Sequence, residues 1–183
     1  MSRESKHRHV AIESIDTENN VLVWAGRKIS DIAEEVGHTP FYCYDRDRLD
    51  RRVAELRAAL PEDISIHYAM KANPMPAVVA HMVTLVDGLD VASGGELRVA
   101  LDTGIDPQLV SFAGPGKRTE ELAQAIASGI TLNVESELEL ERIARIADEQ
   151  DRRASVAIRV NPDFELKTSG MKMGGRPAQF GID

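Results

Sequence analysis

Short apolar segments recur roughly every 20 to 25 residues from Ile64 onward, and segments with helical start and stop signals separate them. Short strands that alternate with helices imply parallel βαβ units, and these units have right-handed crossovers. The sequence therefore predicts an α/β fold built on a parallel sheet. The predicted strands cover residues 65–72, 85–93, 108–114, 130–136 and 155–161.

The helices between these strands have recognisable ends. Ser93 and Glu96 stand at capping-box spacing, as do Ser136 and Glu139. In such a box the serine and the glutamate satisfy free N–H groups of the first helical turn. Gly129 stands where a helix would end in a left-handed residue. These signals support the same alternation of strands and helices.

The repeated units suit either an open doubly wound sheet or part of a (β/α)8 barrel. No GxGxxG or Walker sequence follows a strand, which disfavours a dinucleotide-binding or P-loop fold. Charged residues recur instead at strand ends, at Lys71, Asp90 and Arg159. Because a barrel mouth gathers charges from several strands, we expect a barrel. Eight strands normally need about 250 residues, so about five of the eight βα units are present.

The beginning of the chain predicts a different organisation. Residues 1–18 start with a basic run that we expect to be a flexible tail. Residues 19–45 predict a strand, a short helix that ends at Gly37, and a second strand at 41–45 before the barrel begins. Residues 46–183 then form the incomplete barrel. Its first helix has apolar residues at helical spacing, which we expect to face a core.

Composition disfavours several classes of function. The formal net charge of −8 argues against binding to nucleic acid or to an anionic membrane, because like charges repel. No apolar run approaches the roughly 20 residues needed to span a bilayer, and no signal-peptide core follows the N-terminus. Cys43 is the single cysteine, so an internal disulfide and a zinc–thiolate cluster are excluded, and we predict no metal site. We expect Cys43 to be a small core residue and the protein to be cytoplasmic.

Lys71 is the candidate nucleophile. It ends a segment in which Ser65, His67, Ala69 and Lys71 share one face of an alternating strand. A lysine held where water is scarce can lose its proton and attack a carbonyl, including that of a cofactor. A lysine at a strand end can equally extend to solvent. The spacing alone leaves both interpretations open.

The motifs that contain these residues resemble a known family. YAMKAN, GLDVASGGEL, FAGPGK, NVESELELERI and AIRVNP follow one another as in the fold-type III pyridoxal-phosphate decarboxylases, which include the diaminopimelate, ornithine and arginine decarboxylases. Residues 24–45 are similar to the diaminopimelate branch in particular. Residues 179–181 differ from the Ser-Lys-Phe-Gly of that branch and resemble a subgroup associated with exopolysaccharide and exosortase systems. The resemblance implies an alanine-racemase-like barrel, with residues 19–45 belonging to a β-domain that is otherwise missing.

The resemblance also assigns roles to single residues. Lys71 matches the lysine that forms the internal aldimine with pyridoxal phosphate, and Asp90 matches an aspartate beside it. Arg159 matches an active-site arginine, and Glu96 matches a glutamate near the cofactor. His67 lies one residue pair before Lys71 on the same strand face, where it can stack near the cofactor ring. Other interpretations exist: Asp90 can be a turn or cap residue before the next helix, Glu96 a helix cap and His67 a core histidine. Arg159 can form a salt bridge across the barrel mouth, for which Asp90 is a candidate partner.

The implied activity is decarboxylation of a basic amino acid, with diaminopimelate or a related compound as the substrate. The resemblance further implies a homodimer with shared active sites. The phosphate loops, the acid facing the ring nitrogen and the partner's cysteine would all follow Asp183, so we expect the chain alone to be inactive. Two alternatives stay open: an alanine-racemase-like enzyme, and a non-catalytic regulator or pyridoxal-phosphate-binding protein.

Overall fold

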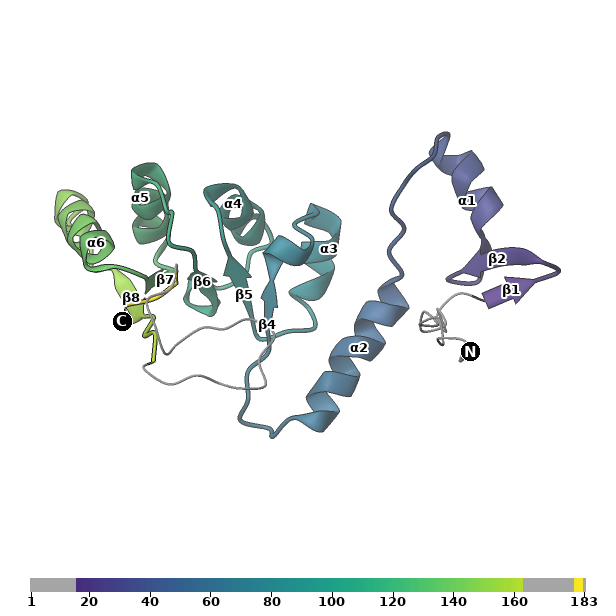
Figure 1. Cartoon of the computed structure of the whole chain (residues 1–183), viewed down its shortest axis with the longest axis horizontal. Helices are drawn as coiled ribbons and strands as arrows, with labels where there is room; N and C mark the ends of the chain where they lie inside the picture. Colours follow the sequence, from purple (N-terminus) through teal and green to yellow (C-terminus); the bar gives the residue numbers. More distant parts are fainter. Residues whose placement is uncertain (1–15, 163–179, 183) are drawn as a thin grey trace, which may run out of the picture. The chain divides into compact units, whose positions relative to one another are not determined.

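The computed structural model describes residues 16–162 and 180–182 (Figure 1). The chain divides into two compact units, and the boundary between Arg52 and Val53 falls inside helix α2 (Arg46–Ala59). Each unit is considered by itself.

The N-terminal unit contains a small antiparallel sheet and one short helix. Asn19 and Asn20 have positive φ angles of 51° and 64°, which suit the tight turn between the first two strands. The helix ends at Gly37, whose φ of 79° lies in the left-handed region, as predicted. The elements are β1 (Asp16–Glu18), β2 (Val21–Trp24), β3 (Arg27–Lys28) and α1 (Ile29–Val36).

Three predictions for this unit and for α2 are wrong. Residues 41–45 do not form a strand, because they have no ladder partner in the described part of the chain, and Tyr42 is 91% exposed. Cys43 is half-buried rather than part of a core. Helix α2 forms as predicted but has no buried residue, and Leu56 is 47% exposed.

The C-terminal unit is a five-stranded parallel sheet in the order β4-β5-β6-β7-β8. A doubly wound sheet would reverse its strand order at a switch point, whereas consecutive neighbours are the arrangement of a (β/α)8 barrel. The predicted barrel topology is therefore confirmed. Each strand is shorter than predicted: β4 (His67–Ala69), β5 (Gly88–Val91), β6 (Val110–Phe112), β7 (Thr131–Val134) and β8 (Ser155–Ile158).

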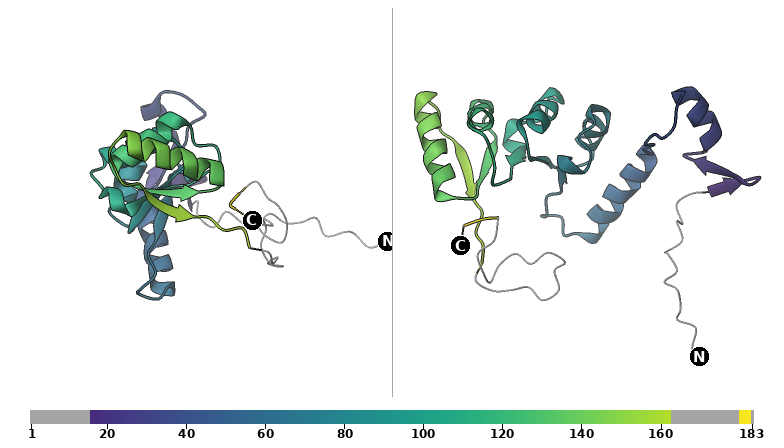
Figure 2. Two further views of the ribbon diagram at one scale, coloured as in Figure 1. Left: turned by 90° about the vertical axis from the view of Figure 1, so that its left-hand side faces the viewer. Right: turned by 45° about the horizontal axis from the view of Figure 1, so that its top comes forward.

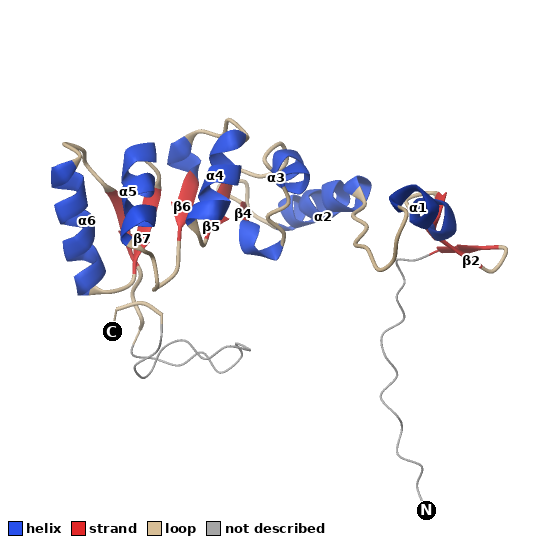
Figure 3. Cartoon of the chain, turned by 90° about the horizontal axis from the view of Figure 1, so that it is seen from above, coloured by secondary structure: helices blue, strands red, loops and turns tan. Residues whose placement is uncertain are grey.

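All the α-helices that follow these strands lie on one side of the sheet, as Figures 1, 2 and 3 show from different directions. They are α3 (Pro76–Met82), α4 (Gly94–Asp102), α5 (Thr119–Ser128) and α6 (Glu137–Glu149), with the 3-10 turns η1 (Met70–Ala72) and η2 (Pro107–Leu109). No helix among the described residues combines the length and the apolar character that crossing a bilayer requires.

The hydrophobic core of this unit includes one set of alternating strand residues. Leu89, Val91, Phe112, Leu132 and Val134 are at most 1% exposed and belong to one cluster with apolar helix residues. Because successive side chains of a strand point to opposite faces, the residues between them face away from the helices. That second face is the inner face of the barrel segment, and it is polar.

The predicted helix caps are present, except that the glutamates do not bond the N–H group of the serine itself. The hydroxyl groups of Ser93 and Ser136 accept hydrogen bonds from the N–H groups of Glu96 and Glu139, both at 3.2 Å. Each glutamate carboxylate accepts a hydrogen bond from the N–H of the residue before the serine: Glu96 from Ala92 at 2.7 Å and Glu139 from Glu135 at 2.9 Å. These contacts fix where α4 and α6 begin, and hence where the loops before them lie.

An ion pair lies at the edge of the five-stranded sheet where the strands begin. Asp87 Oδ2 accepts from the Ile66 N–H and from Arg57 Nη2, both at 2.6 Å. The Ile66 N–H, followed by the Arg57 guanidinium, holds the pKa of Asp87 below its usual range. In barrels this edge stabilises the fold, while chemistry is found at the other edge.

Candidate active site

A chain of polar contacts crosses four adjacent strands on the inner face. Asp90 and Ser111 are paired across β5 and β6, and the Ser111 hydroxyl donates to Asp90 Oδ1 at 2.6 Å. Asn133 Nδ2 on β7 donates to the same hydroxyl at 3.3 Å. On the other side, His67 Nδ1 lies 3.4 Å from Asp90 Oδ1. The Asp90 carboxylate is therefore held in one orientation from both sides.

Gly88 makes room for the His67 ring. The two residues are paired across β4 and β5, and a Cβ atom on Gly88 would lie 2.5 Å from His67 Cε1 and 2.5 Å from the Leu109 carbonyl oxygen. The backbone carbonyl of Leu109 cannot move away from an added methyl group as easily as a flexible side chain can. The absence of a side chain at Gly88 thus allows histidine to reach Asp90.

We predict that Gly88→Ala lowers the free energy of unfolding by about 1–3 kcal/mol, because the added methyl overpacks this contact. Urea unfolding of the whole chain measures the change. The control is Gly95→Ala, where the new Cβ meets no atom closer than 3.7 Å and helix propensity favours alanine. Equal stability of the two variants would refute the tight packing of His67 against Gly88.

A cavity of about 240 Å³ opens at the C-terminal ends of the strands. Its lining includes Lys71, Asp90 and Arg159, which lie within or just after three different strands, together with Gly114 and Phe180. The structure thus brings together the three residues predicted to be catalytic. This is the edge at which barrel enzymes place their chemistry.

Lys71 reaches the cavity from a turn and not from a strand. It lies in η1, directly after β4, which ends three residues earlier than predicted. The side chain is exposed, and within the described ranges its Nζ makes no hydrogen bond or ion pair. Lys71 therefore presents an amine that a bound reactant can engage.

Arg159 forms its ion pair with an acid that was not predicted. Its Nη1 lies 3.3 Å from both carboxylate oxygens of Glu135, and its guanidinium carbon lies 4.9 Å from the centre of the Phe180 ring. The suggested pairing of Arg159 with Asp90 is wrong. The physical reason is strand order: Glu135 directly follows β7, the neighbour of β8, whereas Asp90 lies on β5.

His67 and Glu96 do not line the cavity. His67 contacts Asp90 from below it on the inner face, and Glu96 is engaged in the cap of α4. The structural interpretation of Glu96 as a cap is thus correct. A role for either residue toward a cofactor stays a prediction.

Comparison with known proteins gives the family. Residues 46–183 match the family model described as "Pyridoxal-dependent decarboxylase, pyridoxal binding domain". The chain belongs to this family. Family membership agrees with the predicted fold-type III resemblance. The matched residues include the whole five-stranded sheet and the lining of the cavity.

Individual relatives of this pyridoxal-binding domain include decarboxylases whose names give different substrates. The diaminopimelate decarboxylase of Aquifex aeolicus is 39% identical over 160 residues, which are 86% of this chain and 38% of that protein. The L-glutamyl-[BtrI acyl-carrier protein] decarboxylase of Niallia circulans is also 39% identical, over 79% of this chain and 34% of its own length. The chain thus spans little more than a third of the length of either relative.

Solved structures confirm the fold of the domain. The diaminopimelate decarboxylase of Helicobacter pylori, solved in complex with L-lysine, matches with a TM-score of 0.70 and 34% identity. The match covers 83% of this chain and 39% of that one. The chain is thus similar in both sequence and structure to diaminopimelate decarboxylases.

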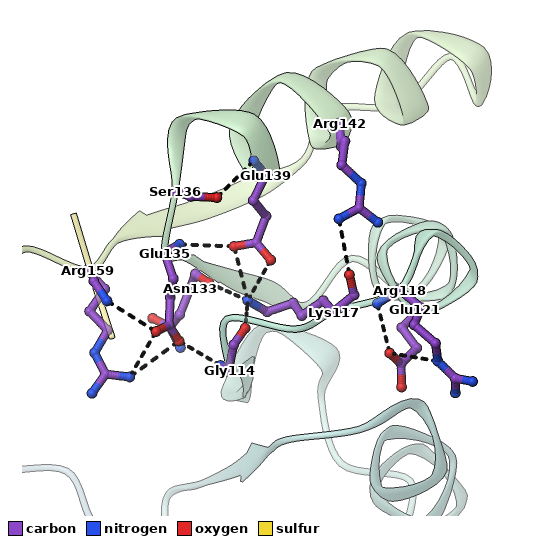
Figure 4. Close-up of polar contacts among 11 residues, drawn as sticks. Gly114, Lys117, Arg118, Glu121, Asn133, Glu135, Ser136, Glu139, Arg142 and Arg159 are labelled. Atoms are coloured by element: carbon purple, nitrogen blue, oxygen red, sulfur yellow. Dashed lines mark hydrogen bonds and ion pairs between the residues drawn. The ribbon is translucent and has the colours of Figure 1, made fainter. Parts of the chain in front are cut away.

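The pyridoxal-binding domain also contains a buried lysine whose contacts differ from those of Lys71. Lys117 is 4% exposed, and its Nζ donates to the carbonyl oxygens of Gly114 and Asn133 at 2.7 and 2.6 Å (Figure 4). It also contacts both carboxylate oxygens of Glu139 at 3.1 and 3.2 Å. These contacts occupy the amine, so Lys117 stabilises the loops and is not available to a reactant. The spacing of Glu139 from Ser136 predicted only its helix cap.

Proposed function

We propose that this domain provides the cofactor lysine of a pyridoxal-phosphate-dependent decarboxylase that acts on a basic amino acid. The observation that carries the proposal is the amine of Lys71, which has no internal partner in the described part of the chain and lines a cavity with Asp90 and Arg159. Family membership supports the cofactor. The activity belongs to the whole protein that includes this chain.

The residues present fit the cofactor chemically. When bound, pyridoxal phosphate supplies an aldehyde that condenses with amines and a ring that withdraws electrons from the α carbon of the substrate. Lys71 is the primary amine suited to that aldehyde. Lys117, the other lysine that the described residues place at this edge, is excluded by its four contacts.

Asp90 and Arg159 supply opposite charges to the cavity. The Asp90 carboxylate favours a positive charge on a neighbouring nitrogen, and the hydrogen bond from Ser111 keeps that carboxylate in place. Arg159 presents a guanidinium, which is suited to binding a carboxylate or another anionic group. Together they orient an amino acid, whose two charged groups need partners of opposite sign.

Diaminopimelate is the first candidate substrate. The chain resembles the diaminopimelate branch, and the Helicobacter pylori structure holds L-lysine, which is diaminopimelate less one CO2. The equal identity to the Niallia circulans decarboxylase keeps other amino acids in the test. The homodimer and the cytoplasmic location predicted from the sequence are part of the same proposal.

Release of CO2 tests the proposed function. The protein expressed from its complete gene, with added pyridoxal phosphate, is assayed with meso-diaminopimelate, lysine, ornithine and arginine. We expect the fastest release from diaminopimelate. No release from any of them, combined with racemisation of alanine, would favour the racemase alternative; no turnover of any kind would favour a non-catalytic role.

A further inference from the structure

Three separate segments meet at one buried carboxylate, that of Glu135. Its side chain is 1% exposed and lies directly after β7. Oε1 accepts from the Gly114 N–H at 2.7 Å, in the loop after β6, and Oε2 accepts from the Gly181 N–H at 3.3 Å. Both oxygens also contact Arg159, as Figure 4 shows. Glu135 thus joins Arg159, directly after β8, to the loop after β6 and to residues 180–182.

The Gly181 end of this arrangement is tightly built. The Ile182 N–H donates to the Arg159 carbonyl at 2.8 Å, which brings residues 180–182 beside the end of β8. A Cβ on Gly181 would lie 3.0 Å from that same carbonyl oxygen, and its φ is +81°. This close approach places the Phe180 ring against the Arg159 guanidinium.

Electrostatics explains why the carboxylate and the guanidinium belong together. A buried carboxylate is stable only when it is paired and hydrogen-bonded. The Arg159 side chain is 31% exposed, so it reaches the cavity while one edge stays on Glu135. A long arginine side chain would otherwise occupy several rotamers.

We propose that Glu135 is a positioning residue that holds the Arg159 guanidinium at the wall of the cavity. It acts through Arg159 and does not line the cavity itself. The inference rests on the proposed function, because it assumes that Arg159 binds an anionic group of the substrate or the cofactor. No motif considered in the sequence pointed to this role.

Glu139 provides a matched control. It is also a buried acid, with a side chain 5% exposed, and it lies four residues further along the chain. Its partner is Lys117 rather than Arg159. Loss of the Glu139 charge leaves the buried Lys117 short of a partner, and loss of the Glu135 charge leaves Arg159 without its ion-pair partner. Both variants are therefore expected to unfold at lower temperature.

The test is a double-mutant cycle on the protein from its complete gene. The variants are Glu135→Gln, Arg159→Met and their combination, with Glu135→Asp and Glu139→Gln alongside. The measurements are the melting temperature, the Kd for pyridoxal phosphate by absorbance titration, and kcat and KM for CO2 release. Glutamine keeps one oxygen that can accept a hydrogen bond but removes the negative charge.

We expect Glu135→Gln to raise Kd or KM by at least about tenfold, because a loss of this size corresponds to one charge-assisted hydrogen bond. In the Arg159→Met background the same change should have less than about a twofold effect, because its target is gone. Glu135→Asp keeps the charge and should recover part of the loss. Glu139→Gln should lower the melting temperature without raising Kd or KM.

Several outcomes would overturn the inference. Equal effects of Glu135→Gln with and without Arg159, or equal effects of Glu135→Gln and Glu139→Gln on Kd and KM, would make Glu135 a purely structural acid. Unchanged Kd and KM in Arg159→Met would also overturn it. Failure of the proposed function is distinguishable, since the unmodified protein would then neither bind the cofactor nor release CO2.

Discussion

Replacement of Lys71 by arginine is expected to lower kcat/KM for CO2 release by more than about 10³-fold. The guanidinium keeps the positive charge but does not lose its proton, so it cannot serve as the amine that engages the aldehyde. Stability should change by no more than about 0.5 kcal/mol, because the exposed Lys71 side chain makes no polar contact within the described residues. The measurements are initial rates at saturating pyridoxal phosphate and urea unfolding.

The control for this variant is Lys28→Arg, on an exposed lysine of the small N-terminal sheet. That variant should retain full activity. If Lys71→Arg kept more than about a tenth of the activity, Lys71 would not be the nucleophile that this account requires.

Replacement of Lys117 by methionine is expected to cause the largest loss of stability. The substitution leaves the buried Glu139 carboxylate without its cation, which typically costs about 3–5 kcal/mol. It also removes the hydrogen bonds to the carbonyl oxygens of Gly114 and Asn133. The free energy of unfolding from urea titration of the whole chain measures the effect.

An exposed ion pair provides the comparison for Lys117. Arg145 and Glu149 on α6 are more than half exposed, so Arg145→Met should change stability by less than about 1 kcal/mol. The double variant Lys117→Met with Glu139→Leu should recover part of the loss, since no buried charge remains. A loss below about 1 kcal/mol in Lys117→Met would contradict the buried pair.

Local chemistry explains why much of the fold could be predicted from the sequence. The serines and glutamates of the two caps act within four residues of each other, and Gly37 ends its helix through its own backbone. The apolar periodicity of β5, β6 and β7 agrees with their burial, whereas the four residues of β8 are all exposed. Such features need no knowledge of distant neighbours.

The partner of Arg159 could not be predicted in this way. Asp90 and Glu135 are both acids at or just after strands, and only the spatial order of the strands selects between them. The capping interpretation of Glu139 likewise gave no sign of Lys117, which lies 22 residues earlier. Contacts between loops depend on the assembled sheet.

Segments 41–45 and 46–59 also show that a local pattern does not determine tertiary contacts. Alternation and helical spacing are properties of the chain, but a strand needs a ladder partner and an apolar helix face needs a cover. Residues 41–45 have no ladder partner among the described residues, and α2 has no buried residue. The predicted inactivity of the chain alone and the predicted dimer stay predictions.

The most direct test of the central claim is chemical labelling of Lys71. The protein from its complete gene is loaded with pyridoxal phosphate, reduced with borohydride and digested, and its peptides are identified by mass spectrometry. We predict a pyridoxyl group on the peptide that contains Lys71 and none on Lys117. An unmodified Lys71, or a label on another lysine, would contradict the account.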